Sequence, residues 1–170
     1  RRYHDVLIRS LLLAAKEVGL DLTPLDAEVL PQHWSALPVF QDVEEALAGL
    51  RALGCNLGVL TNCDDDLFEQ TQRSFRVAFD RVVTAEQVQA YKPSLRHFQF
   101  FERASGVDRA DWVHVACSWF HDIAPARRLV IQRIWLDRDH TGEDPSAASL
   151  RMVSAEGLPA AIEQLCRNPG

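Results

Sequence analysis

The chain has 170 residues, of which 47% are apolar and 25% are charged, with 24 acidic against 18 basic side chains. This composition excludes disordered and fibrous proteins and indicates one globular domain with at most an appendage. The net charge of −6 argues against a surface for nucleic acid or anionic membranes. The apolar stretch at residues 6–15 is broken by Arg9 and is far shorter than the ~20 residues of a membrane span. We therefore expect a cytoplasmic protein whose partners are small molecules or other proteins.

Four cysteines are spread along the chain without a C-x-x-C pair, at Cys55, Cys63, Cys117 and Cys166. This spacing favours reduced, buried thiols over a disulfide framework or a zinc site. The chain opens on Arg1-Arg2-Tyr3 and has its single methionine at position 152, so we expect further sequence upstream.

The first part of the sequence predicts helices and no strand. Apolar residues at helical spacing and a stop at Gly19 predict a helix over residues 3–18. A second helix is expected from Thr23-Pro24 to Pro31, because threonine is a good N-cap and proline fits the first helical turn. Residues 33–38 then form a connection.

From residue 40 onward, strands alternate with helices. Asp42 and Glu45 have the spacing of a capping box at the start of a helix that ends at Gly54. Such alternation indicates βαβ units, hence an α/β fold with a parallel sheet and helices on its faces. The expected strands are 55–60, 81–84, 112–116, 133–136 and 152–153, and the expected helices begin near 64 and cover 95–105, 123–130 and 158–165.

Polar side chains follow three of these strands at the point where each strand ends. They are Thr61-Asn62, the segment Tyr91-Lys92-Pro93-Ser94, and Cys117-Ser118 with Asp122. Because ligands bind beyond the carboxyl ends of parallel strands, these groups predict a pocket for a small anionic substrate. Taken singly, each has a structural explanation, as a strand terminator, a solvated loop lysine or a helix-start carboxylate.

In their order and spacing, these segments resemble motifs two to four of the haloacid dehalogenase superfamily. The quoted blocks are Leu60-Thr61-Asn62, Tyr91-Lys92-Pro93-Ser94 and residues 114–122, HVACSWFHD. Residues 124–126 and 134–138 look closest to the type II 2-haloacid dehalogenase branch. The resemblance implies a Rossmann-like parallel sheet core over residues 39–170 that lacks its first strand, preceded by a partial helical cap over residues 1–38.

The resemblance also implies roles for individual residues. Lys92 is a catalytic cation that offsets the charges of an attacking carboxylate and an anionic substrate. Asp122 orients Lys92, and Thr61 donates a hydrogen bond at the reacting carboxylates. Asn62 and Ser118 bind substrate. Phe98 falls where this branch often has an aromatic residue near the site, although its apolar stripe favours a place in the core.

Two departures from the family pattern bear on the chemistry. The phosphatases of the superfamily usually have an acidic residue where this chain has Cys117, and Mg²⁺ requires oxygen ligands. The sequence therefore favours a metal-independent reaction with no cofactor, and a nucleophilic Cys117 lacks an activating base nearby. The first motif, a nucleophilic aspartate at the end of a strand, has no counterpart before the helical opening, nor has the cap arginine that binds halide.

In the family, the first-motif strand lies between the strands that end here at Thr61 and Cys117. We expect these two strands not to pair with each other, and upstream residues or a second chain to supply the missing strand. Residues 134–142, IWLDRDHTG, imitate the first motif, with Asp137 in the place of the nucleophile. We interpret them as a surface turn, with a permuted nucleophile as the alternative.

The sequence thus predicts a haloacid dehalogenase-like hydrolase that displaces halide from a short 2-haloacid through an aspartyl ester on an upstream residue. A Mg²⁺-dependent small-molecule phosphatase and a non-catalytic scaffold or interaction module are the alternatives. A homodimer is one candidate assembly, and the sequence leaves the oligomeric state open.

Overall fold

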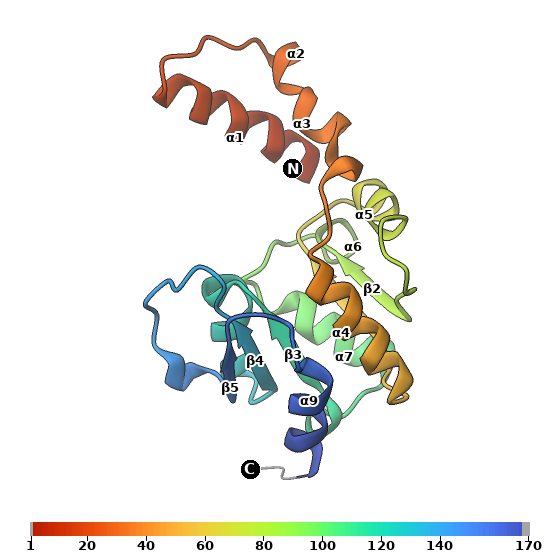
Figure 1. Ribbon diagram of the computed structural model, residues 1–170. Coiled ribbons are helices and arrows are strands. Elements are labelled where there is room, and N and C mark those ends of the chain that lie inside the picture. Colours follow the sequence, from red (N-terminus) through yellow and green to blue (C-terminus); the bar gives the residue numbers. More distant parts are fainter. Residues whose placement is uncertain (1, 168–170) are drawn as a thin grey trace.

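The computed structural model describes residues 2–167, and its first elements are helices that stand apart from the rest of the chain (Figure 1). These helices are α1 (Tyr3–Glu17), α2 (Pro24–Ala27) and α3 (Val29–Gln32), followed by a 3₁₀ turn at Trp34–Ala36. They pack against one another and contain no strand in residues 2–36. We call residues 2–36 the helical arm.

The helix predicted over residues 3–18 is confirmed as α1, but the second predicted helix is broken in two at Glu28. Thr23 begins α2 with a capping box, because its hydroxyl accepts from Asp26 N at 3.3 Å and its own N–H donates to the Asp26 carboxylate at 2.8 Å. Pro31 has no N–H to donate to the carbonyl of Ala27, so a continuous helix loses a bond there.

The remaining elements form an α/β unit whose three strand pairings are all parallel, as the alternation of strands and helices predicted. Strand β1 pairs with β2, and β3, β4 and β5 follow one another in a second sheet. In chain order the elements are α4 (Gln41–Ala52), β1 (Gly58–Thr61), α5 (Asp65–Gln72), β2 (Arg81–Thr84), α6 (Ala85–Val88), α7 (Arg96–Ser105), a 3₁₀ turn (Arg109–Asp111), β3 (Val113–Ala116), a π-helical turn (Trp119–Ile123), α8 (Ala124–Arg128), β4 (Gln132–Leu136), a 3₁₀ turn (Pro145–Ala147), β5 (Leu150–Met152) and α9 (Leu158–Arg167).

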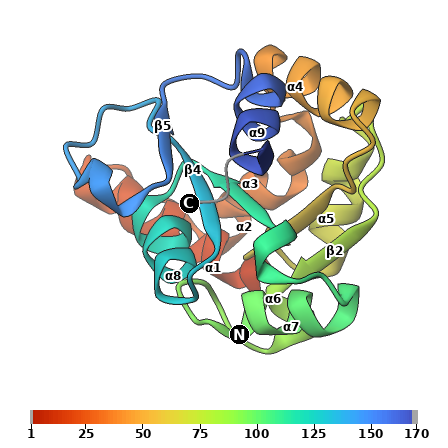
Figure 2. The ribbon, with the colours of Figure 1, turned by 90° about the horizontal axis from the view of Figure 1, so that it is seen from below.

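Helices cover both faces of the strands. On one face, α4 and α9 pack over β3 and β4 through a cluster that includes Leu50, Ile134 and Leu158. On the other, α7 and α8 contribute Phe98 and Ala126, both fully buried. Figure 2 shows α4 and α9 side by side, with α7 and α8 lying elsewhere around the strands. Phe98 is therefore a core residue, as its stripe indicated.

Strands β1 and β3 do not pair with each other in the described part of the chain, as expected. Each has a partner on one side only, β2 and β4 respectively. A cavity of about 870 Å³ lies against both, lined by residues 57–60 and 113–116. We call this cavity the slot. The edges of β1 and β3 that face it have no strand hydrogen-bonded to them among residues 2–167.

Two local predictions are wrong. Asp42 does not cap α4, which begins after Phe40; its carboxylate instead accepts from Arg138 Nη2 at 2.7 Å and Ala155 N at 2.8 Å, so distant donors replace the local cap. The cysteines are free as predicted, but none is fully buried: Cys55 and Cys63 are half-buried, and Cys117 and Cys166 are exposed because both lie at the ends of elements. No helix within residues 2–167 is long and apolar enough to cross a membrane.

Candidate active site

A buried ion pair lies at the carboxyl edge of the strands. Lys92 Nζ donates to Asp122 Oδ1 at 2.7 Å and to the carbonyl of Leu60, near the end of β1, at 2.9 Å. The two side chains are only 12% and 6% exposed. The Lys92 backbone is also fixed, because the Asn62 side chain accepts from its N–H at 2.7 Å and donates to its carbonyl at 3.3 Å. Lys92 is thus fixed both at its backbone and at its ammonium group.

Asp122 reaches this position from the π-helical turn that follows β3. Its backbone N–H donates to Ser118 O at 3.1 Å, and its Oδ1 also accepts from His114 Nε2 at 3.0 Å. Burial raises the pKa of Asp122, but the hydrogen bond from His114 and the charge of Lys92 outweigh it and lower the pKa below its usual value. The carboxylate therefore remains charged beside the ammonium group.

His97, on α7, lies beside the pair and is fully buried. Its Nε2 donates to the carbonyl of Thr61 at 3.1 Å, while its Nδ1 has no partner among the described residues. Burial lowers the pKa of His97 to about 4, so the ring is neutral near pH 7 and adds no second cation beside Lys92.

A cavity of about 430 Å³ opens between the helical arm and this edge, and we call it the site cavity. It is lined by predicted site residues, Asn62, Lys92, Ser118 and Asp122, together with Tyr3, Val6, Tyr91 and His121. Lys92 and Asp122 line the slot as well, so the ion pair stands where the two cavities adjoin.

The predicted site residues therefore come together except for one. Thr61 does not line the site cavity; its hydroxyl accepts from Cys63 N at 3.1 Å. Ser118 lines the cavity, but its hydroxyl is engaged by His121, whose N–H donates to it at 3.2 Å and whose Nδ1 is 2.9 Å away.

Four cavity residues were not predicted from the sequence. Tyr91 and His121 stand inside the quoted motifs, next to residues that were assigned to the site. Tyr3 and Val6 lie on α1. Their place beside the cavity could not be predicted, because a helical pattern does not show which part of the chain the helix will face. The rings of Tyr3 and Tyr91 are 6.3 Å apart and form an aromatic wall.

Asp64 ties the helical arm to the site edge. It is 2% exposed, and its carboxylate accepts from Tyr3 N and His4 N, both at 2.9 Å. The sequence pattern predicted an acidic helix start near residue 64, and Asp64 does precede α5. Its side chain, however, satisfies the free N–H groups in the first turn of α1 and so fixes Tyr3 over the cavity.

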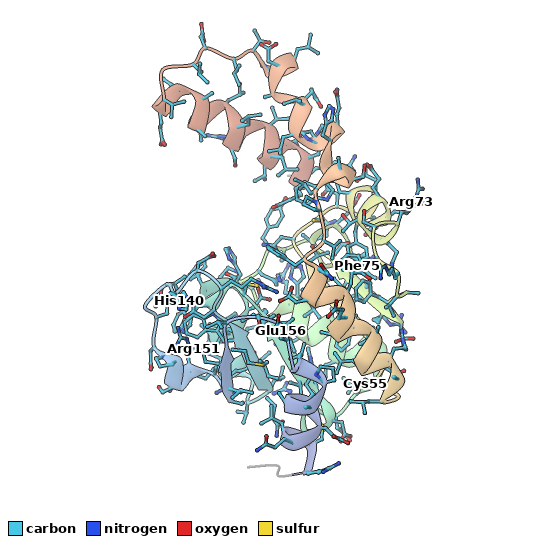
Figure 3. All side chains as sticks on the ribbon, viewed as in Figure 1. Cys55, Arg73, Phe75, His140, Arg151 and Glu156 are labelled. Atoms are coloured by element: carbon cyan, nitrogen blue, oxygen red, sulfur yellow. The ribbon has the colours of Figure 1, made fainter. Side chains whose placement is uncertain are left out.

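The alternative nucleophile, Asp137, is placed for a different task. A surface turn does follow it, since residues 139–142 are exposed, but Asp137 itself is only 2% exposed. Its Oδ1 accepts from Thr141 N at 3.0 Å and its Oδ2 from Arg151 Nε at 2.8 Å. Arg151 also contacts His140, and Figure 3 shows both on the β5 side of the molecule. Asp137 lines neither the site cavity nor the slot, so it organises a loop.

The described residues do not fit a Mg²⁺ ion of the kind that phosphatases of this fold use. No group of three or more His, Cys, Asp or Glu side chains in residues 2–167 could hold a metal. Asp122 is already bonded to a lysine and a histidine, and the nearby Cys117 offers sulfur where Mg²⁺ requires oxygen. Although Cys117 is an exposed residue, the groups around its sulfur desolvate it and raise the pKa of the thiol, which argues against a thiolate nucleophile.

Parallel strands with helices on both faces and a Lys–Asp pair beside a cavity at their carboxyl edge define an α/β protein with a candidate site at the strand ends. The sequence model described as haloacid dehalogenase-like hydrolase matches residues 27–136. The chain therefore belongs to the haloacid dehalogenase-like hydrolase family.

Curated relatives point to the same family. An (S)-2-haloacid dehalogenase of Pseudomonas sp. strain YL is 27% identical over 153 residues, which cover 85% of this chain and 66% of the relative. A phosphoserine phosphatase of Thermus thermophilus is 30% identical over 124 residues, which cover 72% of this chain and 50% of the relative. The chain thus spans slightly less than two thirds of the first relative and half of the second.

Solved structures share the fold. An L-2-haloacid dehalogenase structure superposes with a TM-score of 0.86 at 22% identity, covering 96% of this chain and 73% of the other. The L-2-haloacid dehalogenase of Xanthobacter autotrophicus gives a TM-score of 0.83 at 15% identity, with 96% and 76% covered. At these identities the likeness concerns the fold.

Proposed function

We propose that the protein is a 2-haloacid dehalogenase that displaces halide from a short 2-haloacid without a metal. The observation that carries the proposal is the place of the Lys92–Asp122 pair, which lines both the site cavity and the slot. A strand in the slot, parallel to β1 and β3, would end beside the Lys92 ammonium group. An aspartate at the end of that strand would then face a substrate in the site cavity.

The chemistry follows from this arrangement. The aspartate attacks the α-carbon, a C–O bond forms as the carbon–halogen bond breaks, and halide leaves with the bonding pair. Water then hydrolyses the aspartyl ester, which yields the 2-hydroxy acid and regenerates the aspartate. Lys92 stabilises both the attacking carboxylate and the carboxylate of the substrate, a charge arrangement that is costly without a fixed cation. The helical arm serves as part of a cap that closes over the substrate.

Two dehalogenases among the relatives support this proposal, because each matches 85% of this chain against 72% for the phosphoserine phosphatase. The donor set beside Lys92, a single carboxylate and a thiol, also suits Mg²⁺ poorly. The aromatic wall of Tyr3 and Tyr91 suits the apolar part of a short haloacid. Sedimentation of the purified protein would test the homodimer that the sequence left open.

The test is halide release by the full-length protein from chloroacetate and from each enantiomer of 2-chloropropionate, with EDTA present. In a single turnover in H₂¹⁸O, the hydroxy acid should contain ordinary oxygen and the heavy oxygen should remain on the protein, because water attacks the ester carbonyl of the protein carboxyl. Heavy oxygen in the product would mean direct attack by water. Phosphate release that requires Mg²⁺ would establish a phosphatase instead. No halide release from any short 2-haloacid would overturn the proposal.

A further inference from the structure

A polar side chain is buried in the middle of strand β3, where the sequence pattern suits an apolar one. His114 is 7% exposed, and its ring lies 5.0 Å from the ring of Phe98 and 6.3 Å from that of Trp112. Its neighbours Val113 and Val115 pack into the cluster on the opposite face of the strand. An imidazole buried among aromatic rings costs free energy unless it is hydrogen-bonded.

The bond that satisfies His114 goes to the ion pair. Its Nε2 is 3.0 Å from Asp122 Oδ1, the same oxygen that accepts from Lys92 Nζ at 2.7 Å. Since the carboxylate can only accept, the His114 Nε2 carries the hydrogen. Lys92 bonds in turn to the Leu60 carbonyl, so a chain of hydrogen bonds joins β1 to β3 at the carboxyl end of the slot.

We propose that His114 is a positioning residue, which fixes the Asp122 carboxylate so that it holds Lys92 at the junction of the slot and the site cavity. Its effect on turnover rests on the proposed function, whereas its effect on Asp122 does not. Without His114, the Asp122 carboxylate has lost a buried donor and can rotate, and the lysine that it orients moves with it. Small displacements of a catalytic group lower turnover strongly.

The other ionisable groups near Asp122 do not substitute for His114. His97 is neutral because burial lowers its pKa to about 4, and partial desolvation of the Cys117 sulfur raises the pKa of that thiol. Lys92 and His114 are the groups that lower the pKa of Asp122 against the effect of burial. Removal of the His114 hydrogen bond should therefore raise the pKa of Asp122 and make it neutral at a higher pH than in the wild type.

The activity test compares three variants of the full-length protein. His114→Leu removes the donor, His114→Gln keeps an N–H at a similar reach, and Val115→Ala perturbs the next residue of β3 on its other face. We expect His114→Leu to lower kcat roughly 10- to 100-fold with KM changed less than about threefold. The acid limb of its pH profile should move up by about one unit. His114→Gln should recover most of kcat, and Val115→Ala should keep both the wild-type limb and most of kcat.

Two measurements do not depend on activity. Nitrogen NMR of wild-type protein should find a hydrogen on His114 Nε2 at pH 7, and a bare Nε2 would overturn the proposal even if every variant misfolds. Carbon NMR should show the Asp122 carboxyl titrating at higher pH in His114→Leu than in wild type or His114→Gln. If it does so while no protein releases halide, the proposed function fails and the inference stands. Halide release with an unshifted Asp122 in His114→Leu overturns the inference alone.

Discussion

Two buried aspartates follow neighbouring strands of the same sheet, yet they have different roles. Asp122 comes after β3 and Asp137 directly after β4, with exposed fractions of 4% and 2%. Each pairs with a cation, Lys92 for the first and Arg151 for the second. The Lys92 pair lines two cavities, whereas the Asp137 carboxylate is closed in by Thr141 and Arg151 and lines neither. A buried ion pair therefore becomes a site only where a cavity reaches it.

The largest expected difference between the two regions is in turnover. Lys92→Met removes the charge and keeps the length of the side chain, and Asp122→Asn removes the charge that orients Lys92. Each should lower kcat by about a thousandfold in halide release, since fixed charges supply the largest share of catalysis. Asp137→Asn should stay within about threefold of wild type. Equal losses in the two regions would mean that the site has been assigned to the wrong aspartate.

A second difference should appear in the dependence of stability on pH, because the Asp122 region contains the buried His97. Its pKa is about 4 in the folded protein against 6.5 for an ordinary histidine, so the unfolded chain binds a proton that the folded protein excludes. The stability from this group is complete above pH 6.5 and falls as the pH drops toward 4, by roughly 3 kcal/mol in total.

Urea unfolding of the full-length protein between pH 7.5 and 4.5 measures this slope. His97→Gln keeps a donor for the Thr61 carbonyl but does not titrate, so it should flatten the curve. The exposed His33, replaced by glutamine, serves as the matched control and should leave the slope unchanged. A slope that survives His97→Gln would assign the acid sensitivity to other groups.

A third difference concerns the melting temperature. Asp137→Ala leaves Thr141 N and Arg151 without their acceptor, so the loop that follows β4 loosens. We expect the melting temperature to fall by roughly 3 to 5 °C, while kcat per folded molecule is kept. Calorimetry with a parallel halide assay checks both. A loss of kcat at unchanged melting temperature would show that Asp137 takes part in the chemistry.

These two aspartates also show how far the sequence could lead. The parallel α/β fold was predictable because strand and helix patterns are local, and Lys92 and Asp122 could be singled out because strand ends meet at one edge. Asp137 imitates the family's nucleophile in the spacing of its segment, which the sequence nevertheless led us to interpret as a surface turn. Its hydrogen bonds to Thr141 and Arg151 are tertiary, so no local pattern could reveal that its oxygens are occupied.

Other features of the site were out of reach for the same reason. His114 stood inside a quoted motif, but its bond to Asp122 depends on the π-helical turn that brings the carboxylate back over β3. Asp42 was expected as a helix cap, but distant donors bind it instead. Local rules describe what a side chain can do, and the tertiary fold decides which partner it meets.

The smallest expected effect concerns substrate binding. It shows whether the position of the helical arm, unlike that of the loop beyond Asp137, affects KM. Asp64→Ala removes the acceptor for Tyr3 N and His4 N, and loss of such a cap costs about 1 kcal/mol. Because Tyr3 lines the site cavity, we expect KM for a 2-haloacid to rise about threefold with kcat nearly unchanged. Asp66→Ala is the matched control, since Asp66 is exposed and also contacts Arg2. Asp64 also lies 3.5 Å from Arg2 Nε, so equal increases in KM would assign the effect to the ion pairs with Arg2. The hydrogen bonds from Tyr3 N and His4 N to Asp64 would then have no part in substrate binding.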